Sequence, residues 1–121
     1  MYNTKETEKA SLKNIPEPKG WKILIAMPKV EEKTTGGILR PDQLKHLEET
    51  ASILGYVVKT GELCYSDKDR FPSGPWCKEG DWVIFRSYSG TRFKVGDQEF
   101  RLINDDTVEG VVEDPREFRR A

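Results

Sequence analysis

Thr91-Arg92-Phe93-Lys94-Val95-Gly96-Asp97 is the stretch of the chain with the clearest folding signal. Apolar and polar side chains alternate from residue 91 to residue 95, which is typical of a β-strand with one buried face. Gly96-Asp97 then predicts a tight hairpin turn, because glycine accepts the positive φ that such turns require. Phe100 and Leu102 lie on the returning segment. The stretch therefore predicts an antiparallel β-hairpin.

Further strand-like runs lie on both sides of this hairpin. Residues 21–27 alternate in the same way, and residues 53–58 and 81–86 are continuous apolar runs of strand length. Thr107-Val108 and Val111-Val112 add two short β-branched pairs. About six short strands, separated by Gly, Asp and Asn turns, predict an all-β fold, a small antiparallel sandwich or barrel.

The chain has few apolar residues for a domain that builds its core alone. The 121 residues suit one domain, but hydrophobic residues make up 36% of the chain and charged residues 34%. A compact monomer of this length usually buries more apolar surface. Either part of the chain is unfolded, or neighbouring subunits complete the core.

Charge and residue counts argue against several classes of protein. Lys and Arg number 20 against 21 Asp and Glu, for a net charge of −1, so the basic excess of a nucleic-acid-binding protein is missing. No apolar stretch approaches the ~20 residues of a membrane helix, and the N-terminal residues lack the apolar centre of a signal peptide. Two cysteines and one histidine give little material for a disulfide framework, a zinc site or a catalytic triad. We expect a soluble, intracellular protein without metal or cofactor.

The apolar pattern divides the chain into three parts. Residues 1–17 predict a flexible N-terminal arm, residues 18–114 the β domain, and residues 115–121 a C-terminal tail that frays. Two segments of the domain, residues 28–52 and 61–80, are too long for simple strand connections. Connections of this length are usually functional or disordered, so the function should be sought in them.

Residues 28–42 of the first long segment are polar for most of their length and hold one apolar island, Ile38-Leu39, behind Gly36-Gly37. The glycines keep the backbone free, and only the island could bury itself in a partner, so the segment suits flexible recognition. The alternative is a turn at the glycines with the island packed on its own domain. Residues 41–50 could also form a short helix with Leu44 and Leu47 on one side.

The second long segment, residues 61–80, is rich in turn residues yet carries Tyr65, Phe71 and Trp76. These aromatic side chains either pack over the end of their own domain, which we favour, or meet another surface. Cys64 and Cys77 lie near the two ends of the segment and could face each other. Reduced thiols are the expectation in a reducing compartment.

Four motifs give the chain from about residue 18 to residue 114 a resemblance to the GroES-type co-chaperonins (chaperonin-10 family). Residues 28–42 resemble the family's mobile loop, an acidic, Lys- and Thr-bearing stretch that leads into Gly-Gly-Ile. Residues 78–85 resemble its Lys-x-Gly-Asp-x-Val-apolar-Phe strand, and residues 88–91 its Tyr-Ser-Gly-Thr turn. Residues 104–113 are similar to its closing strand. The motifs occur in the family's order and at nearly its spacing.

The resemblance implies a Greek-key β-barrel with a mobile loop at about residues 28–52 and a roof hairpin at about residues 61–80. It implies a ring, most often a heptamer, in which the first strand of one subunit pairs with the last strand of the next. The residues that this would place at the subunit interface are Ile23, Ile25, Val108 and Val111.

The resemblance also implies a function, which is not enzymatic. The ring would cap an ATP-bound GroEL-type chaperonin in the cytoplasm and enclose unfolded client proteins, without binding nucleotide or another cofactor itself. The chaperonin-binding residues would be Gly36, Gly37, Ile38, Leu39 and Arg40, and the roof residues Tyr65, Phe71 and Trp76. Arg40 stands where a third apolar residue is usual. A cellular origin and a phage-encoded origin both fit, and this departure suits a divergent, phage-encoded member acting in the host cytoplasm.

Two other classes of function compete with this one. A small oligonucleotide-binding or SH3-like interaction module would have a similar barrel, but the chain lacks a basic stripe. A small hydrolase would need a nucleophile motif or convergent carboxylates. The acidic pairs at residues 31–32, 48–49 and 105–106 are adjacent in sequence, and neighbouring residues of a strand point to opposite faces.

Overall fold

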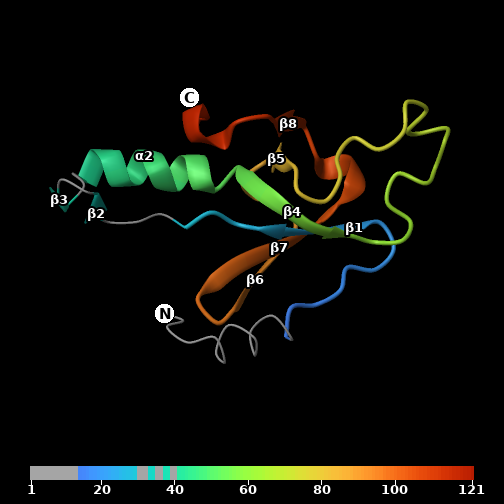
Figure 1. Ribbon diagram of the computed structural model, residues 1–121, viewed down its shortest axis with the longest axis horizontal. Coiled ribbons are helices and arrows are strands. Elements are labelled where there is room, and N and C mark those ends of the chain that lie inside the picture. Colours follow the sequence, from blue (N-terminus) through green and yellow to red (C-terminus); the bar gives the residue numbers. More distant parts are fainter. Residues whose placement is uncertain (1–13, 30–32, 35–36, 39–40) are drawn as a thin grey trace.

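The computed structural model describes residues 14–29, 33–34, 37–38 and 41–121. Six of its strands form one antiparallel sheet in the order β6-β7-β1-β4-β5-β8 (Figure 1). These strands are β1 (Lys22–Ala26), β4 (Leu54–Thr60), β5 (Trp82–Ile84), β6 (Thr91–Val95), β7 (Gln98–Asn104) and β8 (Gly110–Val112). The all-β prediction is confirmed. Within the described residues, β6 and β8 are the edges of the sheet, and each pairs with a single strand.

The hairpin predicted from residues 91–97 is present. β6 and β7 pair with Val95 opposite Gln98, so Gly96 and Asp97 form a two-residue loop. Gly96, the first residue of the loop, has a φ of +62°. This conformation is energetically costly for a residue with a side chain, so the turn favours glycine here. The strand predicted at residues 107–108 is not formed. Asp105–Thr107 instead form the short 3-10 helix η1, and β8 begins only at Gly110.

β1 lies at the centre of the sheet. It pairs with β4 on one edge and with β7 on the other, so it joins the two halves of the sheet. Ile23, Leu24 and Ile25 of this strand are completely buried. The side chains of the main core come from β1, β4, β5 and β7 and from segments beside them, and include Ile23, Ile25, Met27, Val57, Val83, Phe85, Ile103 and Val108.

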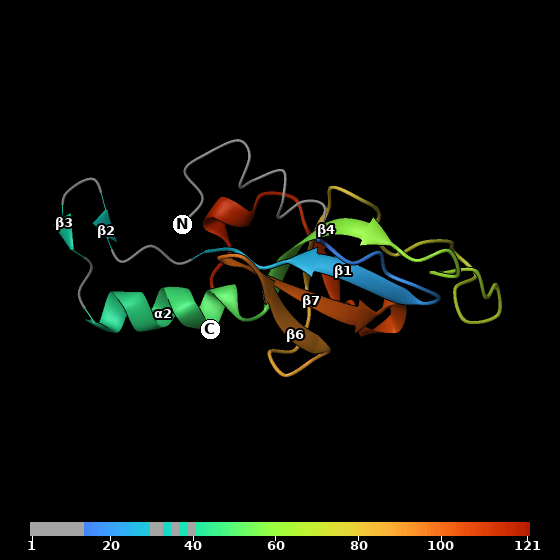
Figure 2. The ribbon, with the colours of Figure 1, turned by 90° about the horizontal axis from the view of Figure 1, so that it is seen from below.

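The long segment between β1 and β4 contains three short elements. β2 (Lys33–Thr34) and β3 (Gly37–Ile38) pair with each other, and the helix α2 (Pro41–Ala51) follows. The helix that the sequence allowed at residues 41–50 is therefore present. In two perpendicular views these elements extend from one end of the sheet, while residues 61–80 extend from the opposite end (Figures 1 and 2).

Both terminal regions touch the domain where they are described. Residues 1–13 of the predicted arm lie outside the described residues, but Glu17 pairs with Lys59 of β4 at 2.8 Å. The predicted frayed tail instead contains the 3-10 helix η2 (Pro115–Glu117) and returns to α2. There the backbone N–H of Arg120 donates to Thr50 Oγ1 at 3.1 Å, and Arg120 Nη1 donates to Ser52 Oγ at 3.3 Å.

The close packing of β4 on the core requires a glycine. A Cβ atom at Gly55 would lie 2.0 Å from Ile25 Cγ2 and 3.1 Å from Phe85 Cε1. We expect Gly55→Ala to lower the free energy of unfolding by about 1–3 kcal/mol, because the crowded core must shift to accept the methyl group. Denaturant unfolding at fixed protein concentration measures this. Gly110→Ala is the control, since its new Cβ would meet only the Ile84 side chain, at 3.1 Å; equal losses would contradict the account.

Candidate functional site

The loop that the sequence singled out is only partly described. Gly37 and Ile38 form β3, where Gly37 lies opposite Thr34 and Ile38 opposite Lys33. Gly36, Leu39 and Arg40 lie outside the described residues. The binding role assigned to these five residues therefore stays a prediction, and the structure adds the position of the paired segment.

α2 separates this segment from the sheet. The helix has 11 residues, which at 1.5 Å per residue corresponds to a length of about 16 Å. β2 and β3 lie at the far end of the helix, and its last turn meets the sheet (Figure 2). The backbone of β3, with Gly37 and Ile38, is thus carried away from the sheet.

The base of α2 is fixed where the helix joins β4. Thr50 is buried, and the Ser52 hydroxyl donates to the Glu49 carbonyl oxygen at 2.6 Å, so part of the helix end is hydrogen-bonded locally. Arg120 of the tail bonds the same turn through Thr50 and Ser52. A cation near a helix C-terminus is also favourable to the helix dipole. The C-terminal tail therefore helps to hold the helix in place.

Residues 61–80, predicted as a roof hairpin, form consecutive turns without paired strands. Their shape is held by side chains, because Tyr65, Phe71 and Trp76 pack together. Phe71 meets both other rings edge to face, with centroids 4.9 Å apart in each pair. Tyr65 and Phe71 belong to the main core, whereas Trp76 is 44% exposed. The aromatic side chains thus pack on their own domain, as favoured from the sequence, and Trp76 also faces outward.

A buried carboxylate anchors this segment to the rest of the domain. Tyr65 has a φ of +58°, a left-handed conformation that costs energy for a bulky residue. Its backbone N–H donates to Asp105 Oδ2 at 2.9 Å, and its hydroxyl donates to the Asp105 carbonyl oxygen at 2.8 Å. Asp105 is 1% exposed. The sequence analysis missed this role, because an Asp-Asp pair after Asn104 is typical of a solvated turn.

The two cysteines lie at the base of the same segment and are free thiols. Cys64 Sγ is 3.2 Å from the Lys22 carbonyl oxygen, and Cys77 Sγ is 3.4 Å from the Tyr65 hydroxyl. Burial raises the pKa of Cys64 to about 11 and also raises the pKa of Cys77. Both thiols are therefore protonated at neutral pH, which makes them poor nucleophiles. Across the described parts of the chain, no three His, Cys, Asp or Glu side chains gather as a metal site.

The predicted interface residues occupy two different settings. Ile23, Ile25 and Val108 are buried in the chain's own core, and both edges of β1 are already paired. Val111 of β8 lies opposite the buried Val83, so it faces the core side of the sheet, yet it is 50% exposed. The open edge beside Val111 is where a further strand could add. The assignment of these residues to a subunit interface stays a prediction.

The anchoring role of Asp105 can be separated from the effect of charge. Asp105→Ala should cost about 1–3 kcal/mol in the free energy of unfolding, because it leaves the Tyr65 N–H buried without a partner. Asp106→Ala is the matched control, since Asp106 makes only an exposed ion pair with Arg70 and should cost about 1 kcal/mol at most. Equal losses in the two variants, measured by denaturant unfolding, would contradict the anchor.

No helix in the described part of the chain is both long and apolar enough to cross a membrane.

Comparison with known proteins gives one consistent result. Residues 16–112 match the family described as Chaperonin 10 Kd subunit. The chain is 34% identical over 97 residues to the Co-chaperonin GroES of Thermotoga neapolitana, covering 80% of this chain and 95% of that protein. It is 31% identical over 98 residues to the Co-chaperonin GroES of Rubrobacter xylanophilus, covering 81% and 97% of the two chains. It is 29% identical over 97 residues to that of Staphylococcus saprophyticus. The chain with its projecting β2–β3 segment, α2 and anchored turn region therefore belongs to the chaperonin-10 family of GroES-type co-chaperonins.

Proposed function

We propose that this co-chaperonin caps an ATP-bound GroEL-type chaperonin and closes a chamber in which client proteins fold. The observation that carries the proposal is the position of β2–β3 in a member of this family. The segment projects on α2 from one end of the sheet, and the roof segment lies at the other end (Figure 1). One end is thus available to a partner ring while the other faces away from it. The setting that we expect is the cytoplasm.

The apolar island would make the contact. Burying Ile38 and Leu39 in a groove would gain roughly 1.5–3 kcal/mol for each side chain. Ordering the backbone around them costs about 1–2 kcal/mol per residue, so a single loop should bind weakly. A ring of identical loops binds through effective concentration, which makes weak contacts into a tight but reversible attachment. The chaperonin can then release the cap in each cycle.

The role of Ile38 can be tested by one charge. Ile38→Asp should abolish binding to a GroEL-type chaperonin in the presence of ATP, because the carboxylate cannot enter an apolar groove unpaired. Ile38→Leu, which keeps the apolar character, should still bind. Native mass measurement of each variant, alone and mixed with chaperonin and ATP, gives assembly and capping together. Undiminished capping by an intact Ile38→Asp ring would overturn the proposed contact.

The ring would form through the open edge of β8. Val111 is half-exposed on the core side of that edge, so a neighbouring subunit would bury apolar surface and pair the free backbone there. β1 could take part in a second pairing only by giving up one that it already has. This arrangement accounts for the low share of apolar residues, because each subunit would complete the core of the next.

A lysine at the edge should block this assembly. We expect Val111→Lys to leave folded monomers, because the added charge would be buried at the interface. Glu113→Lys is the control, since Glu113 follows β8 and is exposed. Analytical ultracentrifugation, with circular dichroism to verify folding, distinguishes the two. A Val111→Lys variant of unchanged oligomeric mass would place the interface elsewhere.

The turn-rich segment at the far end would form the ceiling of the chamber. Leu63 and Trp76 are more than 40% exposed there, although Tyr65 and Phe71 are buried beneath them. Exposed apolar side chains at this position would contact enclosed clients or the same segments of neighbouring subunits.

A further inference from the structure

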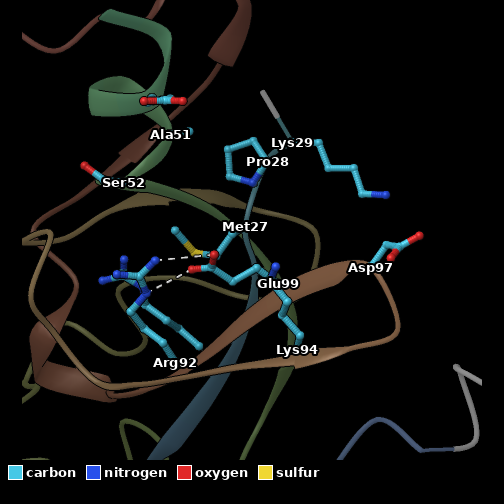
Figure 3. Close-up of a pocket in the computed structure, with 11 residues that line it drawn as sticks. Met27, Pro28, Lys29, Ala51, Ser52, Arg92, Lys94, Asp97 and Glu99 are labelled. Carbon is cyan, nitrogen blue, oxygen red and sulfur yellow. Dashed lines mark hydrogen bonds and ion pairs between the residues drawn. The ribbon is translucent and has the colours of Figure 1, made fainter. Parts of the chain in front are cut away.

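A polar cleft lies beside the base of α2 and has no part in the proposed capping. It encloses about 610 Å³ between the last turn of α2, the end of β1 and the β6–β7 hairpin (Figure 3). Four of the lining side chains are cationic, namely Lys29, Arg92, Lys94 and Arg101, against three carboxylates. The cleft is therefore a candidate site for a negatively charged group.

Two arginines are held together on one wall of the cleft. Arg92 of β6 lies directly opposite Arg101 of β7 in the strand register, so their side chains share one face of the sheet. Like charges at such positions repel each other. Arg92 donates to the Glu99 carboxylate through Nε at 3.1 Å and through Nη2 at 3.4 Å. Within the described part of the chain its Nη1 makes no hydrogen bond and can serve another acceptor. Figure 3 shows these two bonds as dashed lines.

Arg101 is a buried cation that forms no ion pair with a carboxylate among the described residues, although the charge of Glu99 acts on it. The residue is 1% exposed, and its Nη1 donates to the carbonyl oxygens of Ser87 at 2.7 Å and Ser89 at 3.1 Å. Its Nε is buried and has no hydrogen-bond partner among the described residues. The guanidinium also lies over the Phe85 ring, 5.3 Å from its centroid. Burial, and then the charge of Arg92, lower the pKa of Arg101, and the charge of Glu99 opposes them in part.

A buried guanidinium normally has a charged partner, because neutral carbonyl oxygens compensate only part of the lost hydration. We propose that the cleft binds a small oxyanion, a carboxylate or a phosphate group, between Arg92 and Arg101. One oxygen would accept from Arg92 Nη1 and another from Arg101 Nε, since guanidinium groups match the geometry of both anions. The anion would offset the repulsion between the two arginines. This site is independent of the proposed capping of a chaperonin.

The proposal is tested on the full-length protein with three sodium salts at equal ionic strength. Acetate and inorganic phosphate represent the two sources of an oxyanion, and chloride is the reference. We expect acetate or phosphate to shift the ¹⁵N–¹H resonance of Arg101 Nε and to raise the melting temperature above its value in chloride, since a ligand of the folded state stabilises it. The oxyanion that acts at lower concentration identifies the chemistry of the ligand.

Two variants assign the effect to the cleft. Arg92→Gln should weaken binding by about tenfold or more, as expected for the loss of a charged hydrogen bond. The fold should stay intact in this variant, because the Arg92 side chain is 62% exposed. Arg101→Met should abolish the response, and Lys68→Met, which removes a charge from the turn-rich segment at the other end, should leave it unchanged. The proposal is overturned if neither oxyanion differs from chloride, or if all three variants respond like the parent protein.

Discussion

The hydrogen bonding of β1 on both of its edges is the constraint on which the rest of the structure depends. β4 and β7 each pair with this strand, so the two halves of the sheet meet only there. The start of β1 adjoins the turn-rich segment, where the Gly61 N–H donates to the Lys22 carbonyl oxygen at 2.8 Å. Its end adjoins the cleft and leads toward β2. One buried strand thus sets the two functional ends of the molecule at opposite sides.

Buried polar groups hold the features that project from the sheet. Asp105 keeps the turn-rich segment in place through Tyr65, although Tyr65 adopts a strained backbone conformation. At the base of α2, the Thr50 and Ser52 hydroxyl oxygens accept hydrogen bonds from Arg120. In both places a few specific hydrogen bonds replace the apolar packing that a chain with 36% hydrophobic residues cannot supply everywhere. Breaking one of these hydrogen bonds leaves a polar group without a partner away from water, so each bond is costly to lose.

The strands could be predicted from the sequence because their signals are local. Alternation at residues 91–95 and the Gly96-Asp97 turn define β6 and the hairpin without reference to the rest of the chain. The core role of Ile23 and Ile25 was not predicted, since pairing of β1 on both edges depends on distant segments. The roles of Asp105 and Arg101 were not predicted either. Burial of a charged residue depends on the distant segments that pack around it. The loop residues were identified by family motifs, and Gly36, Leu39 and Arg40 lie outside the described residues.

The account makes one central claim, that the end carrying β2 and β3 meets the chaperonin while the sheet stays unchanged. Amide hydrogen exchange of the assembled protein, alone and with a GroEL-type chaperonin and ATP, tests it most directly. We predict that protection rises in peptides covering residues 33–40 and stays constant in β1 and in residues 61–80. Unchanged exchange over residues 33–40 in the complex, or new protection confined to residues 61–80, would contradict the claim.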